Sequence, residues 1–237
     1  MLKALLWKEW HEQRWRMALA GVWLMGVTAI GLKIRLVPDS VVLGLVGLPM
    51  AVLLPVFAGM GLFAEERQAK TMAFLQVQPA RRWQILVAKL GMGWLVFSVP
   101  MTVTFAMVLI TVGSRELPLT LMWLGFTAVL GFGVVMYFWQ ILAGLGVKRQ
   151  ETYAVTCAAV LGAWMIEGLL VDEFARGTAL EFWVWMINPF ALVELLDAWT
   201  YRSMTEVWSV VLVQCVIVVG LAWAVWFRFE RLRERTS

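Results

Sequence analysis

Residues 90–113 read LGMGWLVFSVPMTVTFAMVLITVG and contain no ionisable side chain. A transmembrane helix needs about 20 consecutive apolar residues to cross the hydrocarbon core of a bilayer. The run is continuous and shows no strand-like alternation of apolar and polar residues. Because lipid offers no hydrogen bonds to exposed backbone, only a helix is plausible for such a run. Residues 90–113 are therefore predicted to span a membrane.

Apolar runs on both sides of this one complete the predicted domain. The six predicted spans are about 17–37, 41–64, 90–113, 120–147, 153–171 and 207–227. Of the 237 residues, 62% are hydrophobic and 15% are charged, whereas soluble domains carry about 25% charged residues. This composition excludes a disordered chain, a disulfide scaffold and an ordinary soluble enzyme. We expect an all-α polytopic membrane protein with a single transmembrane domain over 1–237.

The positions of Lys and Arg predict the orientation of these spans. Fifteen of the 20 lie in the N-terminus and in the segments 65–89, 148–152 and 228–237. The other five are Lys33, Arg35, Arg115, Arg176 and Arg202. Because Lys and Arg accumulate in cytoplasmic loops, we expect both termini in the cytoplasm. The opening MLKALLWKEWHEQRWR is too charged for a cleavable signal peptide. The simple topology suggests a prokaryotic cytoplasmic (inner) membrane.

Sites for covalent chemistry or nucleotide binding are not evident. Cys157 and Cys215 both lie in apolar runs and are expected to be small buried hydrophobes. The single histidine, His11, lies in the charged N-terminal segment, so no span combines a base with a nucleophile or predicts a metal site. The chain has no G-x-x-x-x-G-K-[ST] motif, and the nearest fragment, 144–148, lacks its spacing. We expect no catalytic residues, no metal and no cofactor bound by this chain.

Residues 1–16 are predicted to form a helix with two possible roles. Leu2, Leu5, Leu6 and Trp10 recur at helical spacing beside charged residues. One interpretation is an anchor that holds the N-terminus inside. The other is an elbow helix that lies on the inner leaflet and contacts a partner.

The inner loop 65–89 reads EERQAKTMAFLQVQPARRWQILVAK. Thr71 is a candidate cap for a short helix that presents Phe74 and Leu75, and Pro79 ends that helix. A second helix is predicted to begin near Arg81–Arg82 and to continue into the third span. The apolar side chains either dip into lipid headgroups or dock onto a cytoplasmic protein.

This loop resembles the corresponding segment of type-2 ABC transporter permeases, the membrane subunits of exporter type. Their acidic residue, Gly-Thr, Leu-rich turn, Pro-x-Ser-Arg and final Lys are matched by Glu66, Thr71, Leu75, Pro79, Arg82 and Lys89. Leu5-Leu6-Trp7-Lys8-Glu9 resembles a Lys-Glu near the N-terminus of the family, and Asn188-Pro189-Phe190 resembles a family habit before the last span. Lys70, Gln76 and Arg81 depart from the usual Gly, Leu and Ser.

The resemblance implies a coupling helix between spans two and three. In this family the helix sits in a groove of a separate ATPase subunit, which binds ATP and Mg, and two permeases join two ATPases as a homodimer or heterodimer. The residues implied in coupling are Glu66, Thr71, Phe74, Leu75 and Arg82. Membrane lipid is an expected partner and nucleic acid is not.

The outer segment 172–206 contains an apolar run at 182–187 that is too short to span. Pro189 is a candidate start of a helix in which Phe190 is apolar. The segment is either interfacial or, as the resemblance implies, forms a pair of short re-entrant helices that gate the exit, with Pro189 and Phe190 as candidate gate residues. Glu167 is a carboxylate late in span five and is either hydrated or functional. Gln140 and Gln214 either bond between helices or line a path.

Small residues Ala154, Ala158 and Gly162 form a ridge along span five. Such ridges let helices approach closely, here either at a dimer seam or within the chain. Pro49, Pro55 and Pro100 are candidate kinks. The favoured function is the permease of an ATP-driven exporter. A secondary transporter and a non-transporting assembly or force-transmitting subunit remain alternatives, and the substrate is not readable.

Overall fold

The computed structural model describes residues 2–34, 47, 51–59, 62–63, 81–111, 118–147, 149–174, 177–194 and 204–231. Every regular element in these residues is helical. The labelled helices are α1 (Leu2–Ile34), α5 (Arg82–Thr111), α6 (Leu119–Gly144), α7 (Gln150–Phe174), α8 (Ala179–Ile187) and α10 (Met204–Arg231). Residues 51–59 form a further helical segment.

Five of these helices are long and apolar enough to cross a membrane. The candidate spans are Leu2–Lys33, Arg82–Thr111, Met122–Gly144, Glu151–Val171 and Thr205–Arg231. The chain is therefore an all-helical integral membrane protein. These spans correspond to five of the six predicted ones. The predicted second span, 41–64, lies largely outside the described residues, although 51–59 are helical as expected.

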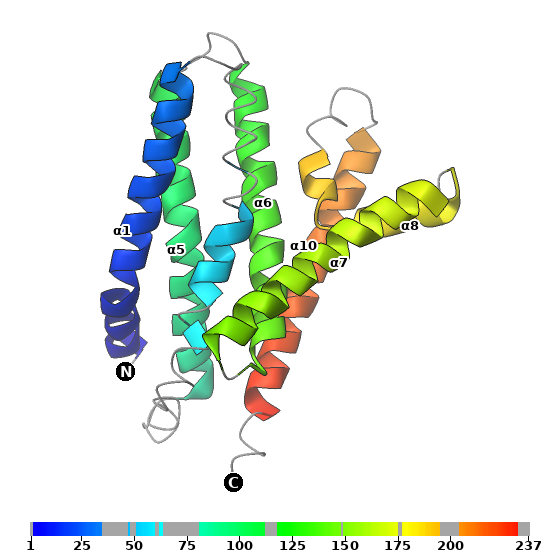
Figure 1. The fold of residues 1–237 in the computed structure, drawn as a ribbon. Helices are drawn as coiled ribbons and strands as arrows, with labels where there is room; N and C mark the ends of the chain where they lie inside the picture. Colours follow the sequence, from blue (N-terminus) through cyan, green and yellow to red (C-terminus); the bar gives the residue numbers. More distant parts are fainter. Residues whose placement is uncertain are drawn as a thin grey trace.

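The helices run up and down between two ends of the bundle (Figure 1). The basal end holds the starts of α1, α5 and α7 and the last turns of α6 and α10, so both chain ends lie there. The distal end holds the starts of α6 and α10. Helix α7 leaves the basal end at a steep angle to α6, and α8 packs against its distal part. Helix α5 begins with Arg82 at the basal end.

The main core lies where α5, α6 and α10 meet residues 51–59 and 62–63. Phe97, Phe132, Met136 and Tyr137 are among its fully buried side chains. The ring of Tyr137 packs 5.4 Å from that of Phe97, centroid to centroid, and its hydroxyl donates to the carbonyl of Leu90 at 2.7 Å. Aromatic contacts of this kind add to the packing that holds helices together where lipid removes most of the hydrophobic driving force.

Helix α1 is continuous from Leu2 to Ile34, which corrects the expected division into an interfacial helix over 1–16 and a span over 17–37. No glycine or proline stands between residues 2 and 20 to break the helix. The charges that suggested a surface helix are accommodated differently, because one of them is paired against α5. The N-terminal segment is thus part of the longest helix of the described chain and packs along α5.

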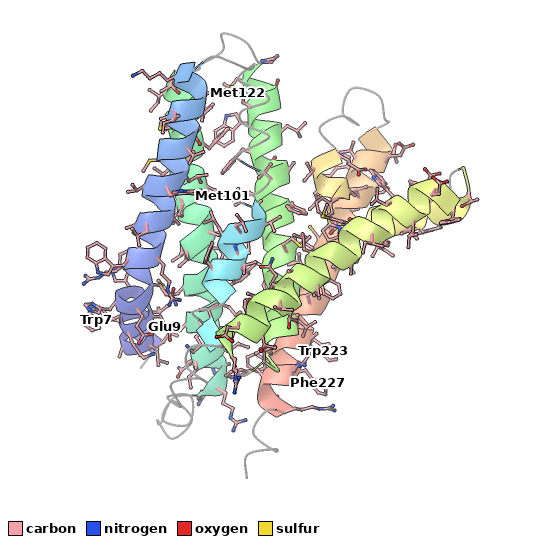
Figure 2. All side chains as sticks on the ribbon, in the orientation of Figure 1. Trp7, Glu9, Met101, Met122, Trp223 and Phe227 are labelled. Atoms are coloured by element: carbon pink, nitrogen blue, oxygen red, sulfur yellow. The ribbon has the colours of Figure 1, made fainter. Side chains whose placement is uncertain are left out.

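The buried face of this segment also differs from the expected apolar face. Leu5, Glu9 and Gln13 are buried, whereas Leu6 and Trp10 are exposed. Figure 2 shows Glu9 on the side of α1 that faces α5 and Trp7 on the outer side. The packed face of this segment therefore includes two polar side chains, Glu9 and Gln13, while the large apolar side chains of Leu6 and Trp10 face outward.

Two smaller expectations have clear outcomes. Helix α5 begins at Arg82, as predicted, and continues through Pro100 to Thr111 without interruption. Both cysteines are free; Cys157 is buried as expected, whereas Cys215 is exposed on α10. The exposure of Cys215 corrects the prediction and has a simple reason. An apolar run indicates that a residue lies within a membrane span. It does not indicate whether the side chain faces the other helices or the outside of the bundle.

Candidate functional site

A buried ion pair joins α1 to α5 near the basal end. Nζ of Lys89 lies 3.0 Å from Oε1 of Glu9, and the two side chains are 0% and 2% exposed. One turn closer to the basal end, Leu5 of α1 packs against Ile85 of α5. This contact helps to place Glu9 of α1 beside Lys89 of α5. Lys89 thus lies about two helical turns along α5 from its first residue, Arg82.

Burial makes this ion pair sensitive to the loss of either partner. A buried pair adds little net stability, because desolvation offsets the attraction, but removing one partner costs about 3–5 kcal/mol. Lys8 adds a second cation at the edge: its Nζ lies 3.5 Å from Oε1 of Glu9 and 3.1 Å from Oε1 of Glu12. In the described residues, Oε2 of Glu9 and Oε1 of Gln13 are buried without a hydrogen-bond partner. This polar cluster specifies which face of α1 meets α5.

Of the five residues implied in coupling, only Arg82 is described. Glu66, Thr71, Phe74 and Leu75 lie outside the described residues. Arg82 is the first residue of α5, and its Nη1 donates to the main-chain oxygen of Glu230 at 3.4 Å. The returning end of loop 65–89 is therefore attached both to α10, through Arg82, and to α1, through Lys89.

A second polar site lies in the distal half of the molecule, where Asn188 joins α8 to α7. Nδ2 of Asn188 donates to Oε2 of Glu167 at 2.6 Å and to the carbonyl of Trp164 at 3.2 Å. Its Oδ1 accepts from the main-chain N–H of Phe190 at 2.9 Å, which caps the turn after Pro189. One buried amide therefore holds the end of α8 against α7 and starts the next helical turn.

Gln214 of α10 binds the same junction from the other side. Its Nε2 lies 2.8, 3.2 and 3.1 Å from the carbonyl oxygens of Met186, Ile187 and Asn188. The last carbonyls of a helix have no partner within the helix, and an amide nitrogen supplies two hydrogens that these acceptors share. Gln214 therefore caps the C-terminal end of α8 inside the protein.

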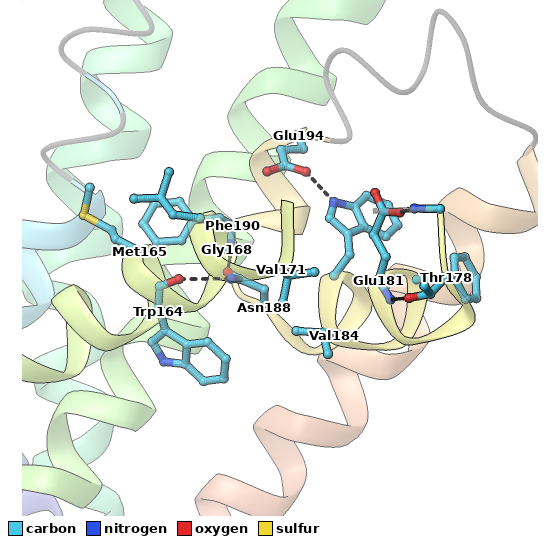
Figure 3. A pocket seen from close by; sticks show the side chains of 14 residues that line it. Trp164, Met165, Gly168, Val171, Thr178, Glu181, Val184, Asn188, Phe190 and Glu194 are labelled. Carbon is cyan, nitrogen blue, oxygen red and sulfur yellow. Dashed lines mark hydrogen bonds between the residues drawn. The ribbon is translucent and has the colours of Figure 1, made fainter. Parts of the chain in front are cut away.

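A pocket of about 760 Å³ adjoins this junction (Figure 3). It lies between the distal half of α7, helix α8 and the segment up to Glu194. Apolar and aromatic side chains form most of its wall, with a few polar groups among them. The described lining residues are Trp164, Met165, Gly168, Leu169, Val171, Gly177, Thr178, Glu181, Phe182, Val184, Trp185, Asn188, Phe190 and Glu194.

The four residues predicted for a substrate path or outer gate do not come together. Phe190 lines the pocket, and Glu167 contacts it only through Asn188. Pro189 is buried beside them. Gln140 lies elsewhere, fully buried on α6, where its Nε2 is 3.5 Å from the carbonyl of Val52. Gln140 therefore makes a hydrogen bond between helical segments, which was the other role considered for it besides lining a path.

The predicted ridge of small residues lies on α7. Ala158 is exposed, and Ala154 and Gly162 are half-buried. A β-carbon placed on Gly162 would meet no described atom within 4 Å. The described chain therefore leaves room beside the ridge at Gly162.

The sequence profile described as "ABC-2 family transporter protein" matches residues 9–232. The chain belongs to this family. The match covers both polar sites and confirms the resemblance to type-2 ABC permeases. ABC-2 permeases lack the ATPase domain and generally work with a separate ATPase partner. No curated protein matches this ABC-2 permease.

Most of the residues that organise these sites lie in recognisable sequence motifs, but the motifs do not indicate their roles. Glu9 and Lys89 appeared in separate motifs, and nothing local to either one indicated its partner. Asn188 stands in the Asn188-Pro189-Phe190 motif, which gives no sign of its contact with α7. The signal that pointed to Gln214 was an amide alone in an apolar run, and its expected interhelical bond is confirmed.

Proposed function

We propose that this ABC-2 permease is the transmembrane subunit of an exporter driven by ATP that a separate cytoplasmic ATPase hydrolyses. ATP and Mg belong to that ATPase, and this chain binds neither. Phe74 and Leu75 dock the coupling helix into the ATPase, while Glu66, Thr71 and Arg82 supply ionic or capping contacts. The family supports the general partnership, and the coupling roles rest on the resemblance of loop 65–89.

The observation that carries the proposal is the Glu9–Lys89 pair. A transporter of this kind needs a rigid link between the site where the ATPase pushes and the helices that move. The pair provides such a link, because a displacement of the start of α5 acts directly on α1 through a contact that is costly to break. Arg82 extends the same link to the end of α10.

The orientation is supported by the arrangement of the helices. Both termini and the start of α5 share the basal end in Figure 1, and the segments assigned to this end by sequence hold most of the Lys and Arg residues. We therefore assign the basal end to the cytoplasm and the protein to a prokaryotic inner membrane. The ATPase then meets loop 65–89 from the cytoplasmic side.

The distal sites fit the outer half of the transport path. Pro189 and Phe190 form the outer gate with α8, and Asn188 and Glu167 hold it closed against α7. Gln140 joins α6 to the 51–59 segment and lies away from this gate. Two copies of the permease pair along Ala154, Ala158 and Gly162, in a homodimer or with a related chain.

The test is purification of the tagged protein from its own cells in a mild detergent. We expect a stoichiometric ATPase to copurify, and we expect Phe74→Asp and Leu75→Asp to release it without reducing membrane insertion. Gln76→Asp is the matched control, because it adds the same charge next to Leu75 at a position already polar. The control should retain the ATPase.

The same preparation tests the link. Lys89→Met should keep the ATPase bound and change the rate of ATP hydrolysis per complex, because binding and transmission use different residues. Combining Glu9→Lys with Lys89→Glu should restore part of the rate. A wild-type chain that purifies without an ATPase, with or without nucleotide, would overturn the proposal in favour of a secondary transporter.

A further inference from the structure

The pocket beside α8 has a wall of aromatic side chains, which suits a ligand that packs against aromatic rings. Trp164, Phe182, Trp185 and Phe190 all line it, and its volume of about 760 Å³ falls within the roughly 300–1,000 Å³ typical of small-molecule sites. Phe182 is 40% exposed, so a ligand can reach the aromatic wall from outside the chain.

The charged groups among the described lining residues of the pocket are acidic. Glu181 and Glu194 line it, and the described lining residues include no Lys, Arg or His. The hydrogen-bond donors found for the two carboxylates are neutral: the main-chain N–H of Gly177 for Glu181 and the indole N–H of Trp185 for Glu194. Glu167 lies just behind the wall and accepts from Asn188. Neutral donors orient the carboxylates without cancelling their charge.

Aromatic faces and carboxylates together select one ligand chemistry. An organic cation gains cation–π attraction from Trp and Phe rings and charge attraction from carboxylates at a site partly shielded from water. An anion of the same shape meets like charges and is rejected. We propose that this pocket binds an organic cation attached to an apolar body. The cation belongs either to a free lipophilic compound or to the ammonium headgroup of a lipid.

The location of the pocket agrees with such a ligand. It adjoins the last two turns of the span Glu151–Val171, at the depth where a membrane helix meets the headgroup region. An amphiphilic cation concentrates at that depth with its apolar body in the acyl chains. The role of this ligand as cargo rests on the proposed function, whereas its binding does not.

The test measures the binding of labelled tetraphenylphosphonium to the full chain by equilibrium dialysis. The protein is kept in dodecyl maltoside, a detergent that carries no charge. Saturable binding is expected for the wild type. The double variant Glu181→Gln/Glu194→Gln should weaken binding roughly tenfold or more, since two nearby charges are lost. Glutamine keeps an acceptor oxygen for Gly177 and Trp185, so the pocket should stay folded.

Two matched controls distinguish a site from general attraction. Glu173→Gln removes an exposed charge on α7 outside the described lining and should leave affinity unchanged. Tetraphenylborate has nearly the shape of the probe with the opposite charge and should not compete. Three results would each overturn the proposal. They are binding that does not saturate, an equal loss of affinity in Glu173→Gln and in the double variant, and competition by tetraphenylborate.

Two further arms identify the source of the cation. Displacement of the probe by phosphatidylethanolamine, but not by phosphatidylglycerol, supports a lipid headgroup. Displacement by neither lipid supports a free lipophilic cation. ATP hydrolysis by a copurified ATPase, measured on the same preparation, separates the two proposals. Probe binding without any ATPase would support the cation site and contradict the exporter proposal. An active ATPase without probe binding would support the exporter proposal and contradict the cation site.

Discussion

Gln214 of α10 donates a hydrogen bond to the main-chain carbonyl of Asn188 at 3.1 Å, while the side chain of Asn188 reaches across to α7. The two amides are buried, and together they connect α7, α8 and α10 at one point. Each of these hydrogen bonds adds little net stability by itself. Losing one costs more, because it leaves a buried polar group without a partner.

The first prediction concerns this amide pair. Gln214→Met keeps the size of the side chain but leaves the last carbonyls of α8 without a donor. We expect the unfolding free energy to fall by about 1–3 kcal/mol and the melting temperature to fall accordingly, as measured by fluorescence-detected size exclusion in detergent. Ser209→Ala on the same helix removes only a local bond to the carbonyl of Thr205. A Gln214→Met protein as stable as Ser209→Ala would contradict the capping role.

The second prediction concerns the close packing of Tyr153 against Gly144. A β-carbon on Gly144 would lie 1.9 Å from Cε2 of Tyr153, and that ring is buried. Gly144→Ala should therefore destabilise the protein by about 1–3 kcal/mol or more through overpacking, read as a lower melting temperature. Adding Tyr153→Leu should recover part of the loss by making room.

Gly220→Ala is the control for that experiment, since a β-carbon there meets no described atom within 4 Å. Alanine also has the higher helix propensity. Equal melting temperatures for Gly144→Ala and Gly220→Ala would show that the ring of Tyr153 can move aside at little cost.

The third prediction is a double-mutant cycle on the buried ion pair. Glu9→Leu and Lys89→Leu should each lower the unfolding free energy by about 3–5 kcal/mol, because each removes one partner of a buried ion pair. The double variant should lose much less than the sum, since it buries no charge. Thermal unfolding in detergent measures all three.

The exposed pair Lys8–Glu12 serves as the reference for that cycle. Its side chains are 37% and 48% exposed, and exposed pairs contribute about 0–1 kcal/mol. Additive losses for Glu9→Leu and Lys89→Leu would mean that the two charges do not depend on each other.

The fourth prediction concerns the ridge on α7. If two copies meet along Ala154, Ala158 and Gly162, Ala158→Leu should lower the dimer fraction in light scattering, because close approach needs small side chains. Ala159→Leu is the matched control: Ala159 is also exposed but points about 100° away around the helix. The same dimer fraction in both variants would place the seam elsewhere.

Local patterns in the sequence were enough for the helices. The 24 residues of 90–113 predict a span whatever they pack against, because lipid requires a helix to satisfy its own backbone. The restart of a helix at Arg82 followed from Pro79 and the residues after it. By contrast, the elbow at 1–16 was wrong, because charge alone does not distinguish a surface helix from one whose charges are paired inside.

The sequence by itself determined that this chain is a helical membrane protein, where most of its spans lie and, through the motif of loop 65–89, its family. Hydropathy and turn chemistry are properties of a few adjacent residues, so they can be read in order along the chain. Only the tertiary structure decided that Glu9 meets Lys89, that Gln214 caps α8, and that Leu6 and Trp10 of α1 face outward while Glu9 and Gln13 are buried. Those outcomes depend on which faces of distant helices pack together, and a polar residue in an apolar run shows that it needs a partner but not where that partner is.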